Sequence, residues 1–480
     1  MDQKTGLFMR VQRRTSSLLL ALFGLIVLTT SSCVDEKIVF RDRVLFEDPP
    51  SAAMGMVGYS EVEAKLTVCG NCHVGQQSEW EGSGHADAWA GLQDSGHAQD
   101  FCNGCHTVNE LGNELSQPSG YLAVADIRYT DVQCESCHGP GLGHVENPDA
   151  TQPLAPIDVG TDLVFGCGEC HEGTHHPFAS EWAESGHGGV ISYAASRPEC
   201  ASCHEGKAAL AAFNVTADYL EKGSAEAMPI TCAVCHDPHG SSFEGQLRFP
   251  VQTASVEQHM CAQCHDRRTE PNPASSHGLH PHSPHTAMLQ GEAGWFPPNV
   301  RIQRGEIIAT HGAEGNQGLC ATCHVDAFEI TDQATGEFVF NATGHLFKAI
   351  PCVDEQGVPT TGDCGLDLDD RAFRGCATGA CHGGSVQGAF SAMVTATTRL
   401  ENLAEELHAL LLLVDPNGED AGGAIDAGDP TFTVAEGAYF NWALAAFGGE
   451  DRADTRLTYA AAAAHNPFRM EQLLIASMNV

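Results

Sequence analysis

The stretch Cys69-Gly70-Asn71-Cys72-His73 decides how this sequence is interpreted, because its pattern returns seven more times. Each copy has two cysteines separated by two residues, with a histidine directly after the second cysteine. The further copies are Cys102, Cys105 and His106; Cys134, Cys137 and His138; Cys167, Cys170 and His171; Cys200, Cys203 and His204; Cys232, Cys235 and His236; Cys261, Cys264 and His265; and Cys320, Cys323 and His324. Such repetition indicates one chemical task performed many times along the chain.

This spacing is the one that covalent haem attachment needs. Two thiols add across the two vinyl groups of a haem, and the adjacent histidine binds the iron from one face. A single motif in a reducing compartment could instead hold zinc or act as a redox dithiol. Eight motifs behind the export signal described below favour haem c as the cofactor.

A ninth motif has wider spacing. Cys376, Cys381 and His382 keep the order of the other motifs but place four residues between the cysteines. We therefore expect nine haem c groups; a disulfide beside an ordinary histidine is the alternative at this position. Of the 21 cysteines, Cys33, Cys352 and Cys364 remain, and the last two are expected to form a disulfide in an oxidising compartment.

The N-terminus has the features of an export signal. Arginines at positions 10, 13 and 14 precede an apolar stretch at 18–28 that is too short to span a membrane comfortably. Small polar residues then lead to Cys33, which resembles the lipidated cysteine of a bacterial lipoprotein; an ordinary cleaved signal peptide is the alternative. We expect residues 1–33 to be the signal, residues 34–60 a tether, and the mature protein to lie in the periplasm or at the outer membrane or cell surface.

The chain is strongly acidic. It has 24 Lys and Arg against 62 Asp and Glu, a formal net charge of -38. This charge argues against nucleic acid and anionic lipid headgroups as partners. It suits a hydrated protein outside the cytoplasm, although charge used only for solubility would look the same.

The spacing of the motifs indicates an internal duplication. The first six motifs begin at residues 69, 102, 134, 167, 200 and 232, in steps of 32 or 33 residues. Motifs one and four are both followed by Ser-Glu-Trp and then Ser-Gly-His, ending at His85 and His187. We infer three-haem modules at 61–160 and 161–256, three further haems at 257–385, and a helical region at 386–480 that supplies a distal ligand. A worn third copy is suggested to start at Cys320. Trp80 and Trp182 are expected to pack between helix and porphyrin.

Each haem iron has a second axial position that another histidine can fill. Sixteen of the 25 histidines lie outside the motifs, which is enough for nine such ligands. The candidates are His85, His187 and His345, each after a glycine; His144 and His239, each shortly after a motif; and His97, His311, His465 and His285, with His277, His280 and His282 as alternatives to His285. For His175, His176, His259 and His408, a surface histidine or one that bonds a haem propionate is expected instead.

The expected fold is mainly α-helical and irregular, with little or no β-sheet, and is organised around stacked haems. The nine motifs span residues 69 to 382, about 35 residues for each haem, so porphyrins must supply much of the buried apolar volume. After the last motif, leucine spacing predicts a helix at 399–414, and two further helices are expected at about 434–447 and 466–478.

Two short stretches carry a family resemblance. His465-Asn466-Pro467-Phe468 resembles the closing helix of many multihaem c-type cytochromes, including relatives of the pentahaem nitrite reductases. Cys134 to Gly141, with His144, is similar to multihaem cytochromes of respiratory and extracellular electron transfer. The resemblance covers most of residues 61–480, and it implies that His465 is a distal haem ligand.

Three functions are compatible with these features. The first is an electron carrier in an anaerobic or extracellular respiratory chain, hopping single electrons along nine haems between redox protein donors and acceptors, with no catalytic residue. The second is an oxidoreductase of the nitrite, hydroxylamine or tetrathionate class with one open-site haem; the absence of a Cys-x-x-Cys-Lys motif counts against typical pentahaem nitrite reductases. The third is a subunit of a haem filament or of an outer-membrane porin conduit. A lipid anchor would hold the protein at a membrane surface.

Overall fold

A computed structural model of the chain describes residues 46–160, 165–272, 278, 280–298, 301–306, 310–312, 316–362, 364–378, 381–414, 433–446 and 458–480. Phe46 to Val480 belong to one unit. The expected signal segment, with Cys33, lies outside the described residues, and so does His277.

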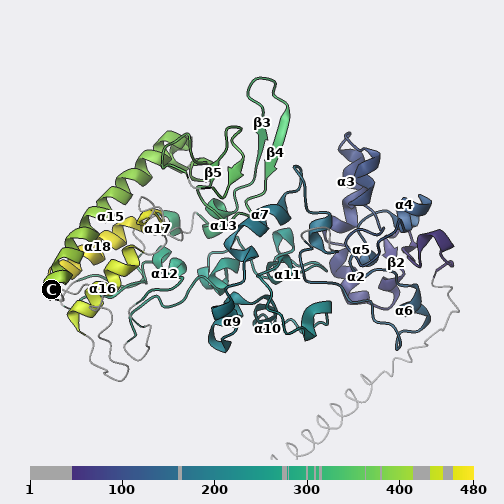
Figure 1. Cartoon of the computed structure of the whole chain (residues 1–480), viewed down its shortest axis with the longest axis horizontal. Helices are drawn as coiled ribbons and strands as arrows, with labels where there is room; N and C mark the ends of the chain where they lie inside the picture. The colour runs from purple at the N-terminus through teal and green to yellow at the C-terminus, as the bar shows by residue number, and fades with distance from the viewer. Residues whose placement is uncertain are drawn as a thin grey trace, which may run out of the picture. The chain divides into compact units, whose positions relative to one another are not determined.

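Helices are short in the region of the motifs and long only near the C-terminus (Figure 1). The 51 glycines and 23 prolines of the chain limit helix length, because both residues are poor helix formers. The α-helices are α2 (Val74–Trp80), α3 (Ala88–Asp94), α4 (Gly120–Val124), α5 (Cys134–His138), α6 (Leu142–Glu146), α7 (Phe178–Glu184), α8 (Ser192–Ala195), α9 (Pro198–His204), α10 (Gly206–Ala212), α11 (Cys232–Cys235), α12 (His285–Leu289), α13 (Leu319–His324), α14 (Arg374–Ala377), α15 (Val386–Val414), α16 (Val434–Ala445), α17 (Ala460–His465) and α18 (Pro467–Met478).

The strands form three small antiparallel pairs within the described residues. They are β1 (Tyr59–Glu61) with β2 (Leu66–Thr67), β3 (Phe328–Thr331) with β4 (Phe338–Ala342), and β5 (Cys352–Val353) with β6 (Pro359–Thr360). In the longest pair Phe328 lies opposite Ala342, and in the last pair Cys352 lies opposite Thr360. The expectation of a mainly helical and irregular fold with little sheet is confirmed.

Each motif begins on a short helical element. These are 3-10 turns η2 (Cys69–Asn71), η4 (Asp100–Gly104), η6 (Cys167–Glu169) and η11 (Met260–Gln263), helices α5, α9, α11 and α13, and, for the wider ninth motif, α14 followed by η13 (Cys381–Gly384). Residues three and four apart lie on one face of a helical turn. The two thiols and the imidazole of a motif with two intervening residues therefore reach toward the same side.

The C-terminal helices contain the largest apolar core. Helices α15, α16, α17 and α18 pack together, and α17 also packs on α12 (Figure 1). Leu400, Leu407, Leu444 and Leu473 are fully buried there. The three expected helices are confirmed, with α15 starting earlier, at Val386. A capping box between Thr433 and Glu436 begins α16, as expected for this residue pair.

Residues 51–60, expected as the end of the tether, belong to the folded unit. Ala53 and Met56 are fully buried with Val108 and Tyr129. The buried carboxylate of Glu135 accepts hydrogen bonds from the backbone N–H groups of Val57 and Gly58. Residues 51–60 are thus folded, although their polar composition indicated a tether. Within the described ranges, no helix is both long and apolar enough to cross a membrane.

Candidate functional site

Eight of the nine motif histidines lie opposite a second histidine from elsewhere in the chain, and each has a different partner. Their ring centroids are 5.8 to 6.4 Å apart. The pairs are His73 with His144, His138 with His239, His171 with His85, His204 with His282, His236 with His345, His265 with His187, His324 with His465, and His382 with His311.

This separation fits one metal ion between two rings. Two metal–nitrogen bonds of about 2 Å, with half a ring on either side, bring opposed imidazole centroids to about 6 Å. The rings of these pairs are exposed or half-buried, so a ligand can reach them. Val74, directly after His73, and Phe101, directly before Cys102, are exposed apolar side chains of the kind that a porphyrin face would cover.

The ninth motif histidine, His106, lies near His176. Burial lowers the pKa of His176, and the neighbouring imidazoles of His106 and His175 lower it further. His97, the sequence-based candidate from the same region, is exposed, and no ring contact among the described residues joins it to a motif histidine.

The remaining histidines occupy other places. His285, an expected ligand, lies 5.8 Å from His265 and 5.2 Å from His465, both of which also belong to pairs. His175 stacks on Phe338, and His408 stacks on Trp442. His280 lies against Tyr439. Fully buried His259 accepts a hydrogen bond from the backbone N–H of Cys261 and contacts the carbonyl of Gly318.

Backbone carbonyls fix many of the paired rings. The Nδ1–H group of His106 donates to the carbonyl of Ala88 at 2.8 Å, that of His138 to Pro153 at 2.7 Å, and that of His324 to Phe347 at 2.8 Å. The same kind of bond is present at His144, His236, His311 and His345. A histidine held in this way presents Nε2 to a metal, the usual arrangement around metal-binding imidazoles.

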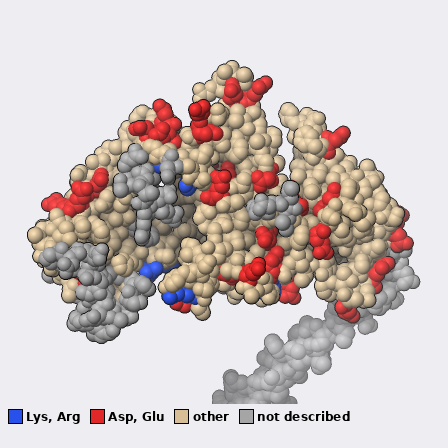
Figure 2. Space-filling view, in the orientation of Figure 1, with Lys and Arg blue, Asp and Glu red and all other residues tan. Residues whose placement is uncertain are grey.

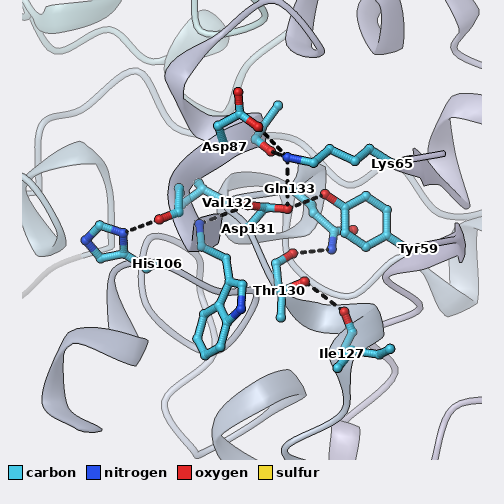
Figure 3. Close-up of polar contacts among 12 residues, drawn as sticks. Tyr59, Lys65, Asp87, His106, Ile127, Thr130, Asp131, Val132 and Gln133 are labelled. Carbon is cyan, nitrogen blue, oxygen red and sulfur yellow. Dashed lines mark hydrogen bonds and ion pairs between the residues drawn. The ribbon is translucent and has the colours of Figure 1, made fainter. Parts of the chain in front are cut away.

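A polar network around Asp131 holds the carbonyl that orients His106 (Figure 3). The buried carboxylate of Asp131 accepts hydrogen bonds from the hydroxyl of Tyr59 at 2.8 Å and from the backbone N–H of Trp89 at 2.9 Å. Lys65 lies 3.7 Å from the same carboxylate. Because Trp89 follows Ala88 directly, these contacts set the start of α3 and the acceptor of His106.

Burial also sets the charge of the imidazoles. It lowers the pKa of His171, His187, His265 and His345 to about 4, and that of His465 to about 3. Neighbouring imidazoles lower these pKa values further. At neutral pH these five rings are therefore uncharged, which is the form that binds metal.

The motif thiols are not paired in disulfides, whereas Cys352 and Cys364 form the disulfide that their position indicated. Thiols of different motifs nevertheless lie close enough to shift one another's pKa. The pairs are Cys69 with Cys134, Cys105 with Cys170, Cys167 with Cys232, Cys203 with Cys264, and Cys261 with Cys320. The sulfur atoms of Cys261 and Cys320 lie within 4.8 Å of each other. Weaker neighbours are Cys137 with Cys167, Cys235 with Cys261, and Cys323 with Cys376.

Comparison with known proteins gives three partial matches. The doubled CXXCH motif family matches residues 225–270, and the family of cytochrome c554 and c-prime matches residues 68–139. The multiheme cytochrome MtrA of Shewanella baltica (strain OS185) is 27% identical over 195 residues, which are 36% of this chain and 54% of MtrA. The match thus spans about half the length of that relative. No solved structure matches the chain.

Proposed function

We propose that this chain, a multihaem c-type cytochrome, binds nine haems and carries electrons along them one at a time. The observation that carries the proposal is the partner histidine beside every motif histidine: eight opposed ring pairs, with His176 near His106 as the ninth. Two imidazoles on each iron would leave no coordination position for a substrate. That supports a carrier over an oxidoreductase with an open site.

We assign the motif histidines as proximal ligands and their partners as distal ligands. The distal set is His144, His176, His239, His85, His282, His345, His187, His465 and His311, in the order of the nine motifs. His265 has both His187 and His285 nearby. We choose His187, because it stands in the same context as His85, the partner of His171.

Haem supplies the redox chemistry, since its iron gains and loses a single electron without leaving the protein. The chain contributes ligands, fixed orientation and low solvent access. Carbonyl bonds to Nδ1 hold the rings so that Nε2 faces the iron position. Imidazoles held in this way would keep the ligand set unchanged while electrons pass.

Neighbouring thiols suggest the route. They link the haem of motif 1 to motif 3, then to 4, 6, 7, 8 and 9. Motifs 2 and 5 lie outside this series: the thiols of motif 2 neighbour those of motif 4, and the thiols of motif 5 neighbour those of motif 7. Adjacent haems in this order would form a continuous path across the chain.

We further propose that the protein works after export, in the periplasm or at the outer membrane. The export-signal pattern and Cys33 support this location, with a lipid anchor at Cys33. Donors and acceptors would be redox proteins with basic docking faces, since acidic side chains are spread over the surface shown in Figure 2. Docking on an outer-membrane porin or assembly into filaments are the further arrangements that this location permits.

Intact mass of the exported protein tests the haem count. We expect nine haems, and a protein carrying eight would refute the assignment of Cys376, Cys381 and His382. The double variant C376A/C381A should lose one haem. Its matched control is C352A/C364A, which removes the disulfide and should keep all nine.

A further inference from the structure

The first two modules share particular contacts as well as motif spacing. The indole N–H of Trp80 donates to the carbonyl of Val132 at 2.9 Å, and that of Trp182 donates to Ile230 at 2.8 Å. Val132 and Ile230 each stand two residues before a third motif. Their backbone N–H groups donate to the carbonyls of His85 and His187, both at 3.1 Å. The two segments are thus the same arrangement, repeated in three dimensions.

Neighbouring thiols extend the repeat to a third copy. In the first two modules the thiols of the first and third motifs are neighbours, Cys69 with Cys134 and Cys167 with Cys232, and each pair is 65 residues apart. The sulfur atoms of Cys261 and Cys320 lie within 4.8 Å of each other, and these residues are 59 apart in the sequence. This places the start of the third copy at Cys261, in place of the start at Cys320 that the sequence suggested.

The third copy therefore lacks a middle motif. In the first two copies the thiols of the middle motif neighbour those of the first motif of the following copy, Cys105 with Cys170 and Cys203 with Cys264. The middle motif therefore lies beside the path that joins the first and third motifs. Loss of a middle haem would remove a side branch and leave the main path continuous.

The histidine pairs cross between copies in both directions. One histidine goes forward: His85 lies opposite His171, the first motif of copy two, and His187 lies opposite His265, the first motif of copy three. Histidines also come back to the middle and third motifs of the preceding copy. These are His176 near His106, His239 opposite His138, His282 opposite His204, and His345 opposite His236.

We propose that the chain repeats one haem unit, beginning at Cys69, Cys167 and Cys261, and that successive copies complete each other by exchanging axial ligands. Each copy gives one histidine forward and receives from the following copy the distal ligands of its middle and third haems. The inference rests on the proposed function, because it concerns the distal ligands assigned there.

The ends of the array follow from the same rule. At the first copy described, haem 1 takes His144 from its own copy. At the third copy, haem 8 takes His465 from the C-terminal helices. A single copy cannot complete its own ligand set, and neighbouring copies therefore depend on one another.

The experiment asks which haem His85 serves. In the full-length exported protein, H85M introduces a methionine ligand, whose bond to ferric iron has its own weak charge-transfer absorption. The same change is made in C167A/C170A, which lacks haem 4, and in C69A/C72A, which lacks haem 1, with each haem loss checked by intact mass. We expect the methionine band in the parent and in C69A/C72A, and complete loss of it in C167A/C170A. A band that survives without haem 4 and disappears without haem 1 would overturn the exchange.

The copies beginning at Cys167 and Cys261 give an independent measurement if one of the double-cysteine variants does not accumulate. H187M should show its band in C167A/C170A and lose it in C261A/C264A, and the reverse would contradict the rule. Whether the exchange is supported or contradicted, the haem count and spin state of the unmodified protein are measured separately. Failure of the exchange is therefore distinguishable from failure of the nine-haem carrier, which appears in the unmodified protein.

Discussion

The orientation of the His106 ring depends on a buried carboxylate. Asp131 accepts a hydrogen bond from the backbone N–H of Trp89, and the adjacent carbonyl of Ala88 accepts one from the Nδ1–H group of His106. Contacts of this kind fix the tautomer and the direction of an imidazole before iron binds. The described residues thus hold histidines in orientations that suit iron.

Replacement of His176 tests the least expected ligand. We expect His176→Ala to convert one of the nine haems from low to high spin while all nine stay attached, because His176 lies near His106. His97→Ala is the matched control and should leave every haem low-spin, since that side chain is exposed. Absorption spectra and electron paramagnetic resonance report the spin state. A high-spin haem in the His97 variant alone would reverse the assignment.

Glu181 positions His345 through its backbone. The buried carboxylate accepts hydrogen bonds from the N–H and hydroxyl groups of Thr343, at 2.9 and 2.7 Å, and from the N–H of His345 at 2.7 Å. Glu181→Gln replaces a carboxylate oxygen by an amide N–H group, which cannot accept these hydrogen bonds. We expect this to destabilise the segment around His345 by about 1–3 kcal/mol. We expect the potential of one haem to shift in a redox titration. Glu184 is exposed on the same helix, so Glu184→Gln is the matched control and should leave every haem potential unchanged. An unchanged potential in the Glu181→Gln variant would contradict the positioning role of Glu181.

Sequence reasoning found the histidines whose surroundings repeat, and missed those whose position depends on the fold. His85 and His187 share a local pattern, and each lies opposite a motif histidine. His175 and His176 are adjacent and equivalent in sequence. Only the fold separates them, because strand β4 places Phe338 against His175, whereas His106 is near enough to His176 to lower its pKa.

At the scale of elements, the C-terminal helices act as a support for one ligand. His465 ends α17, and Asn466 then caps α18 and donates through its side chain to the carbonyl of Met288 near the end of α12. The apolar core beneath these helices fixes the position of His465 opposite His324.

Leu407 tests that support. Its side chain is 1% exposed in the core of α15, α16 and α18, so Leu407→Ala should cost about 2–5 kcal/mol of local stability. Hydrogen exchange of the C-terminal helices measures the loss, and we expect partial high-spin character at one haem. Leu413 lies on the same helix but is 79% exposed, so Leu413→Ala should have an effect below about 0.5 kcal/mol. Equal effects of the two changes would contradict this account of the core.

Elements were predictable where a periodic apolar pattern exists. The leucines of 399–414 have helical spacing and predicted the second half of α15. Residues 386–398 contain no leucine and carry mostly small, polar or β-branched side chains, so they gave no such signal. The spacing of the motifs suggested a third copy starting at Cys320; the proposed start at Cys261 could not be predicted, because it depends on the closeness of the Cys261 and Cys320 thiols in the fold.

At the scale of the whole molecule, charge governs encounter with partners. The formal net charge is -38, and acidic groups are more widespread than basic groups on the face shown in Figure 2. Attraction between opposite charges raises association rates and weakens as salt screens it. We expect reduction by a small cationic complex to slow by about tenfold from low to high salt. Reduction by an anionic complex of similar potential should become faster under the same change. Stopped-flow spectroscopy measures both rates, and salt-independent rates would contradict a charge-steered encounter.

The central claim is that all nine irons carry two histidines. Low-temperature electron paramagnetic resonance of the oxidised full-length protein tests it most directly, because low-spin and high-spin ferric haem give separate signals. The account predicts low-spin haem only, unchanged by nitrite or hydroxylamine. A substantial high-spin signal that either compound abolishes would contradict it and would identify an iron with an open face.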